Sequence, residues 1–192
     1  MFTGRDERRL TAAENNGFAT KGKNMTPTEV IKEMVASGEA GDMNRLDEVL
    51  DDALEFTGAA PQPLGKSDFL DFSRAMTRAI PNVKFNLKIY SDQDGDWVRG
   101  ETRITGVHKG ALELPFLPKI AATKKRIKLP VERFVALVRD DKIVSFSSES
   151  SAGSGLIGIL RQIGRDDLAD CLLSAERDCR TLEESAPVGV HA

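Results

Sequence analysis

Cysteine and histidine are scarce in this sequence, with two of each among 192 residues. Cys171 and Cys179 both lie near the C-terminal end, too few and too peripheral for a disulfide framework. The two histidines are far apart in the chain and form no metal-ligand set with the cysteines. We therefore expect free thiols in an intracellular, reducing compartment, either the cytoplasm or the stroma or matrix of an organelle, and no metal site.

Long apolar runs and a strong charge of one sign are also missing. No window approaches the ~20 apolar residues that a membrane helix needs, so we expect no membrane span. The net charge of −3 gives no general attraction to nucleic acid, which would need more positive charge with interleaved aromatic residues. Residues 1–24 are polar, lack the apolar stretch of a secretory signal, and predict a disordered N-terminal arm.

The clearest pattern that is present is strand alternation. Val83, Phe85, Leu87 and Ile89 alternate with polar residues, which predicts a half-buried strand over 83–90. Turn signals such as Asp94-Gly95 separate it from further apolar segments. These predict three more long strands, over 97–108, 127–139 and 142–149. The pattern indicates an antiparallel meander, with the connection over 110–126 folding across the sheet as a lid.

Helices precede these strands. Thr26 and Glu29 form a capping box for a helix that ends near Gly38, and Asp42 caps a second one. A brief strand over 54–57 follows, and Ser67 caps a third helix that Pro81 terminates. Two later helices are expected over 155–163 and 167–174.

This order predicts an α+β fold: a cone-shaped, curved antiparallel sheet with the N-terminal helices packed on its concave face. We expect one domain over 25–165, followed by a C-terminal helix and flexible tail over 166–192. The open end of the cone is the natural site for a small molecule.

Two side chains are candidates for acid/base catalysis in such a cone. His108 shares strand parity with Thr102 and Ile104 and is either a surface or turn histidine at the rim or a catalytic group. Glu132 lies in an apolar strand on the face of Phe134, and is either a catalytic acid or the partner of an arginine on a neighbouring strand, Arg99 or Arg103. The ligand-binding side chains that we expect are Tyr90, Val98, Thr102, Ile104, Phe134, Phe146 and Ser148.

A basic cluster lies around the predicted lid, formed by Lys119, Lys124, Lys125, Arg126 and Lys128. It either attracts an anionic ligand or partner or is simply the solvated surface of a hairpin. Serines over 147–151 have no adjacent His-Asp pair, which argues against nucleophilic serine chemistry.

The sequence resembles the SnoaL-like polyketide cyclase and ester cyclase group of the nuclear transport factor 2-like fold. Four pieces in a shared order carry the resemblance: Gly41-Asp42-Met43, Ile80-Pro81-Asn82-Val83-Lys84-Phe85, Thr105-Gly106-Val107-His108-Lys109-Gly110, and Asp141-Lys142-Ile143-Val144 leading to Gly155-Leu156 and Arg161-Gln162-Ile163-Gly164.

The resemblance implies a cofactor-free enzyme of the cyclase or isomerase type, or a cone that binds a small hydrophobic molecule without chemistry. The cyclases of this group use an aspartate on the last strand as the acid/base. Here the corresponding segment, 145–151, has no aspartate, and strand parity points its one carboxylate, Glu149, away from the cone. A third hypothesis is a structural or assembly protein, because such sheets commonly pair through their outer faces into homodimers.

Overall fold

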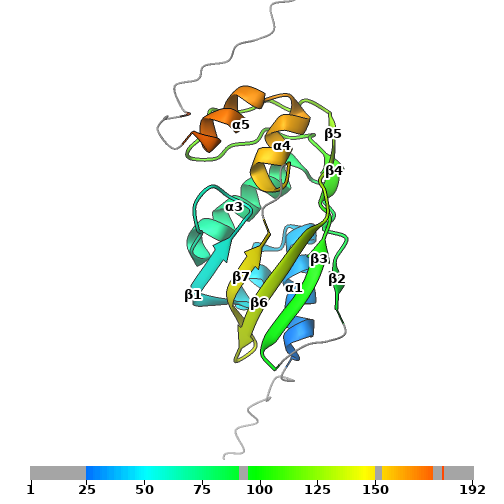
Figure 1. Ribbon diagram of the computed structural model, residues 1–192, viewed down its shortest axis with the longest axis vertical. Helices are drawn as coiled ribbons and strands as arrows, with labels where there is room; N and C mark the ends of the chain where they lie inside the picture. The colour runs from blue at the N-terminus through cyan, green and yellow to red at the C-terminus, as the bar shows by residue number, and fades with distance from the viewer. Residues whose placement is uncertain (1–24, 91–94, 150–152, 175–178, 180–192) are drawn as a thin grey trace, which may run out of the picture.

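The computed structural model describes residues 25–90, 95–149, 153–174 and 179 (Figure 1). A curved, open sheet forms one layer, and α1 lies behind it in Figure 1. The later helices and a small second sheet lie at one end of the molecule. This arrangement confirms the predicted α+β fold. The predicted arm over 1–24 and nearly all of the predicted tail beyond Ser174 lie outside the described residues.

The first two helices begin where the capping residues predict. Thr26 precedes α1 (Pro27–Ala40) and forms the complete capping box with Glu29. The end of α1 lies beyond Gly38, where the sequence predicted it. The C-terminal cap is Gly41, which has a left-handed φ of 71°. Asp42 caps α2 (Met43–Glu48) through the Arg45 N–H. The third helix, α3 (Lys66–Ala79), begins after Gly65 instead of at Ser67 and ends before Pro81, as predicted.

The main sheet has five strands in the order β1-β7-β6-β3-β2. Their bounds are β1 (Leu50–Thr57), β2 (Lys88–Ile89), β3 (Trp97–Thr102), β6 (Glu132–Arg139) and β7 (Lys142–Ser148). β1 pairs with β7 in parallel, which corrects the prediction of a wholly antiparallel sheet. A tight turn forces its two strands to be antiparallel, but β1 reaches β7 through a long crossover and is free of that constraint.

Three predicted long strands are interrupted. The predicted strand over 83–90 is reduced to β2 and an isolated bridge between Lys84 and Thr105, because Asn86 has a φ of 46° and bends the chain. The segment over 97–108 divides into β3 and β4 (Thr105–Val107), and the next divides into β5 (Arg126–Lys128) and β6 around Pro130. Proline has no N–H to donate to a ladder. β4 and β5 therefore form a separate two-stranded sheet.

Two hydrophobic cores stabilise the fold. The lower core lies between α1 and the inner face of the main sheet, and includes Ile31 and Val98. The upper core joins α4 (Gly155–Ile163) and α5 (Asp166–Leu173) to the connection over 110–126. Leu112 and Leu117 of that connection are buried in this upper core, so the segment is part of the upper core instead of a lid across the sheet.

The two cysteines differ from the sequence-based expectation. Cys171 of α5 and Cys179 are joined in a disulfide bond and both are buried in the upper core, so neither is the free thiol that was predicted. The disulfide removes the argument for a reducing compartment. Of the helices in the described ranges, none combines the length and the apolar character required to cross a bilayer.

Candidate functional site

A cavity of about 110 Å³ lies inside the cone, between α1, α3, the inner face of the sheet and the start of α4. Its wall is mostly apolar, and several phenylalanines and methionines form it: Met34, Phe56, Phe69, Phe72, Met76, Phe85 and Phe146. Phe56 stacks against Phe146 with ring centroids 5.1 Å apart and lies 4.4 Å from Phe69. The cavity is therefore suited to an apolar molecule with a ring.

Glu132 is the only ionisable side chain in the wall formed by the described residues. It is the first residue of β6, lies opposite Thr102 of β3, and is only 5% exposed. Its Oε1 accepts a hydrogen bond of 3.0 Å from the N–H of Gly155, the first residue of α4. Burial raises the pKa of the Glu132 carboxyl group, and the Gly155 N–H opposes that rise.

The predicted arginine partners of Glu132 are not its partners in the structure. Arg99 is exposed and lies opposite Val135 in the β3–β6 ladder, so strand alternation places it on the other face of the sheet. Arg103 follows the end of β3 and is also exposed. Among the described residues the carboxylate of Glu132 bonds to the Gly155 N–H, which makes it both a cavity side chain and a cap of α4.

His108 lies elsewhere. Its side chain is fully buried, so the interpretation as a surface histidine at the rim is wrong, and it does not line the cavity. The N–H of Thr123 donates to its Nδ1 at 3.2 Å, which leaves the proton on Nε2. Nε2 has no hydrogen-bond partner among the described residues. Burial lowers the pKa of His108. The break between β3 and β4 explains the misplacement, because strand parity does not extend across it.

The other predicted ligand-binding residues divide into two groups. Thr102, Ile104, Phe146 and Ser148 line the cavity. Val98 and Phe134 are buried in the lower core but are not part of the cavity wall, and the Tyr90 hydroxyl donates to Glu101 at 3.3 Å away from the cavity. The ligand-binding residues predicted from the sequence all came from strands, so the part of the cavity wall that the helices form was missed. The apolar spacing of Phe69, Phe72 and Met76 was the sequence pattern that could have predicted it.

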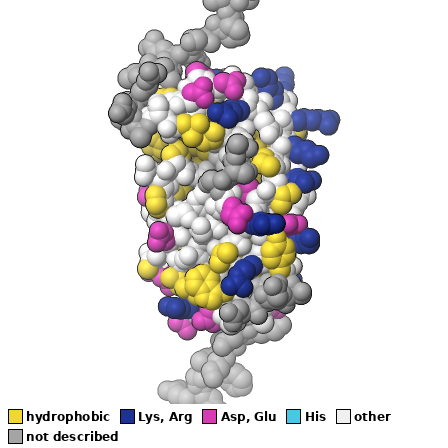
Figure 2. Space-filling view, in the orientation of Figure 1, with side chains coloured by type: hydrophobic (Ala, Val, Ile, Leu, Met, Phe, Trp, Pro, Cys, Tyr) yellow, Lys and Arg dark blue, Asp and Glu magenta, His cyan; other side chains and the backbone are white. Residues whose placement is uncertain are grey.

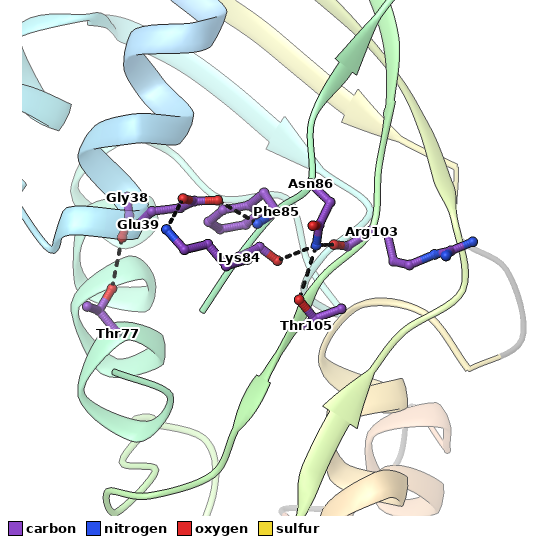
Figure 3. Close-up of polar contacts among 8 residues, drawn as sticks. All are labelled: Gly38, Glu39, Thr77, Lys84, Phe85, Asn86, Arg103 and Thr105. Carbon is purple, nitrogen blue, oxygen red and sulfur yellow. Dashed lines mark hydrogen bonds and ion pairs between the residues drawn. The ribbon is translucent and has the colours of Figure 1, made fainter. Parts of the chain in front are cut away.

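Polar contacts join three segments of the cavity wall (Figure 3). Glu39, near the end of α1, pairs with Lys84 at 2.6 Å and accepts the N–H of Phe85 at 2.8 Å. On the other side of α1, Thr77 of α3 donates to the carbonyl of Gly38 at 3.4 Å. Gly38, Thr77 and Phe85 all line the cavity, so these contacts hold α1, α3 and the segment before β2 around it.

Asn86 supports the same wall from outside. Its side-chain amide donates to the carbonyl of Arg103 at 2.7 Å, to Thr105 Oγ1 at 3.1 Å and to the carbonyl of Lys84 at 3.3 Å (Figure 3). Asparagine tolerates the left-handed backbone that this bend requires better than most residues do. The bend separates Phe85 from Leu87, and both side chains reach the cavity.

The basic cluster lies on the surface, away from the cavity. Lys124, Lys125, Arg126 and Lys128 are exposed, and Lys119 is paired with Glu113 at 2.5 Å. Figure 2 shows Lys and Arg side chains projecting in a row along the edge of the molecule where β4 and β5 lie in Figure 1. The cluster is exposed to solvent and does not contribute to the cavity wall.

Comparison with known proteins agrees with this geometry. The sequence model of the family described as SnoaL-like polyketide cyclase matches residues 28–149, which is more than half of the chain. The chain belongs to this SnoaL-like family. No curated protein sequence matches it.

Solved structures that resemble this SnoaL-like chain include a candidate polyketide cyclase from Pseudomonas putida KT2440, with 21% identity, a TM-score of 0.57 and coverage of 72% of this chain and 98% of the other. A protein from Catenulispora acidiphila with a ketosteroid isomerase-like fold, crystallised with trimethylamine, has 20% identity and a TM-score of 0.54 over 76% and 98% of the two chains. An epoxide hydrolase from Mycobacterium tuberculosis has 18% identity and a TM-score of 0.50 over 71% and 91%. Identities this low establish the fold alone.

The last strand of this SnoaL-like chain differs from the acid/base pattern that the family resemblance implies. The side chains of β7 in the cavity wall are Phe146 and Ser148, while Glu149 is exposed, as strand parity predicts. Among the described residues the last strand thus presents no carboxylate to the cavity. The carboxylate that does reach it, Glu132, comes from the neighbouring strand β6.

Proposed function

We propose that the cone binds a small, largely apolar molecule and that Glu132 exchanges a proton with it, in a cofactor-free reaction of the cyclase or isomerase type. The observation that carries this proposal is one buried carboxyl group in an otherwise apolar cavity wall. A carboxyl group in such a position is a recurrent acid/base catalyst, because burial brings its pKa closer to neutral pH.

The contacts of Glu132 support this role. Gly155 occupies Oε1 and orients the carboxyl group, so Oε2 remains for a bound molecule. Gly155 has a φ of 56°, and a Cβ atom at this position would lie 3.0 Å from the carbonyl oxygen of Ala59. A glycine is thus needed for this N–H to reach Glu132 without strain. The apolar wall keeps water away from the proton that would be transferred.

The second candidate is a cone that binds the same kind of molecule without chemistry. Two observations favour it: β7 brings no carboxylate to the cavity among the described residues, and Glu132 already caps α4. Both candidates require an occupied cavity, so they differ only in turnover.

We also propose that the outer sheet face, defined by Trp97, Arg99, Arg133 and Val135, forms a homodimer interface. Trp97 is 40% and Val135 36% exposed on this face. Figure 2 shows hydrophobic and charged side chains mixed on the same side. Arg133 lies opposite Glu101 in the ladder, so both signs of charge are available to a two-fold partner.

The test starts with the protein purified from its own source, analysed by native and then denaturing mass spectrometry. A mass excess that disappears on denaturation identifies the class of compound to test for turnover. We expect Glu132→Gln to retain binding, because glutamine can still accept the Gly155 N–H, but to lose turnover by about 10²- to 10⁴-fold. Glu149→Gln, on the exposed side of the next strand, is the matched control and should be fully active.

Unchanged turnover in the Glu132→Gln variant would refute the catalytic role. Binding of the compound without conversion by the wild-type protein would favour the non-catalytic cone. If no compound is retained and a screen of small apolar molecules leaves the melting temperature unchanged, both candidates fail.

A further inference from the structure

Thr102 and Glu132 are two polar side chains placed side by side in the apolar wall of the cavity. They are paired directly across the β3–β6 ladder, and both line the cavity. Residues directly opposite each other in an antiparallel ladder have Cβ atoms about 4.5–5.5 Å apart. A single atom of a bound molecule can therefore reach both side chains.

The hydroxyl of Thr102 is available for such an atom. Two other hydroxyls in the wall are already engaged, since Thr77 donates to the carbonyl of Ser73 at 2.9 Å and Ser148 to that of Thr57 at 3.4 Å. The hydroxyl of Ser73 comes from α3, whereas Thr102 lies directly opposite Glu132. Thr102 forms no side-chain hydrogen bond with any described residue, although it is half-buried. A ligand oxygen that reaches this hydroxyl gains one hydrogen bond, which contributes about 0.5–1.5 kcal/mol.

The dimensions and the aromatic wall limit what can bind. The cavity measures about 110 Å³, whereas pockets for drug-sized molecules have about 300–1,000 Å³. An apolar cavity of about 150 Å³ in another protein accommodates benzene. The ring centroid of Phe56 lies 4.4 Å from that of Phe69 and 5.1 Å from that of Phe146, so three aromatic rings are grouped in the wall. The cavity thus suits one ring with few additional atoms.

We infer that the cavity selects a single-ring compound with one oxygen substituent, a hydroxyl or a keto group, and that Thr102 is the specificity-determining residue that recognises this oxygen beside Glu132. The inference rests on the proposed function, because it assumes that the cavity binds a small apolar molecule. The threonine hydroxyl can donate to either kind of oxygen. Glu132 accepts from a hydroxyl when ionised and donates to a keto oxygen when protonated.

The test measures the affinities of benzene, phenol and cyclohexanone by isothermal titration calorimetry with the wild-type protein and three variants. Thr102→Val removes the hydroxyl with little change in shape, Thr102→Ser keeps it, and Thr57→Val removes a hydroxyl outside the cavity wall. We expect phenol, cyclohexanone or both to bind about 3- to 10-fold more tightly than benzene, the factor that one hydrogen bond supplies. Thr102→Val should weaken this preference, because Glu132 alone then contacts the oxygen, while Thr102→Ser and Thr57→Val should retain it in full.

The outcomes separate this inference from the proposed function. If benzene binds but the oxygen substituent brings no gain, or if the gain is as large in Thr102→Val as in the wild type, the cavity is a binding site and the role of Thr102 is refuted. If none of the three probes binds the wild-type protein, the proposed function fails and the inference fails with it. Phenol and cyclohexanone distinguish a hydroxyl from a keto oxygen. As Glu132 ionises it can no longer donate to a keto oxygen, so only the preference for cyclohexanone over benzene should weaken.

Discussion

Replacing Glu132 by glutamine should remove a specific pH dependence from the stability of the protein. Burial raises the pKa of Glu132 above its usual value of 4.5, so the folded protein holds this proton more tightly than the unfolded chain does. The stabilisation that follows is complete below pH 4.5 and is lost as the pH rises through the folded-state pKa. Glutamine does not titrate, so the variant lacks this loss.

The magnitude follows from one proton. Between the unfolded and folded pKa values of Glu132, the stability of the wild type relative to Glu132→Gln should fall by about 1.4 kcal/mol per pH unit. For a chain of 150–250 residues a change of 1 kcal/mol shifts the melting temperature by about 2–4 °C. The melting temperature difference should therefore change by about 3–6 °C per pH unit and become constant once Glu132 is ionised in the folded protein.

Differential scanning fluorimetry of the wild type and Glu132→Gln from pH 4 to pH 9 measures this difference. The contributions of all other ionisable groups cancel, because both proteins contain them. Glu101→Gln is the control of opposite sign, because the hydrogen bond from Lys88 lowers the pKa of Glu101. Its contribution to stability is present above pH 4.5 and is lost as the pH falls through the folded-state pKa. A melting temperature difference between wild type and Glu132→Gln that stays constant above pH 4.5 would refute the burial argument.

Three further predictions follow from other side chains. Burial lowers the pKa of His108 below 6.5, so wild-type stability relative to His108→Gln should decrease as the pH falls from 6.5. Urea unfolding should show a decrease of up to about 1.4 kcal/mol per pH unit, and a stability difference that does not change with pH would contradict this prediction. Asn86→Ala should cost about 2 kcal/mol in the same assay through lost hydrogen bonds, and Asn86→Gly about 1 kcal/mol less because glycine accepts the positive φ; equal losses would disprove the backbone contribution. Val135→Glu should convert the proposed dimer to a monomer in size-exclusion chromatography with light scattering, and a wild-type monomer at micromolar concentration would rule the interface out.

Local sequence signals were most reliable where the chemistry of a few neighbouring residues decides the structure. The Thr26–Glu29 capping box and the Asp42 cap formed as predicted, since each involves backbone groups within one helical turn. Strand parity correctly directed Thr102 toward the cavity and Glu149 away from it, because side chains alternate along an unbroken strand. For Glu132 it left a cavity acid and an arginine partner open, and the structure places the side chain in the cavity wall.

Local pattern was insufficient wherever a distant segment supplied the decisive contact. The parallel pairing of β1 with β7 and the bond between Glu132 and the Gly155 N–H join residues that are far apart in sequence. His108 shows the same limit, because its parity matched that of Ile104 but it is buried outside the cavity wall, where Thr123 contacts its ring.

The sequence alone thus determined the family and the starts of the first two helices, which depend on residue order and short-range geometry. Only the tertiary structure decided that α1 and α3 complete the cavity wall, that its volume is about 110 Å³, and that Glu132 has a backbone N–H as its partner. The physical reason is that a cavity is the space left between packed elements, so its size and its polar contacts depend on the placement of all its walls together.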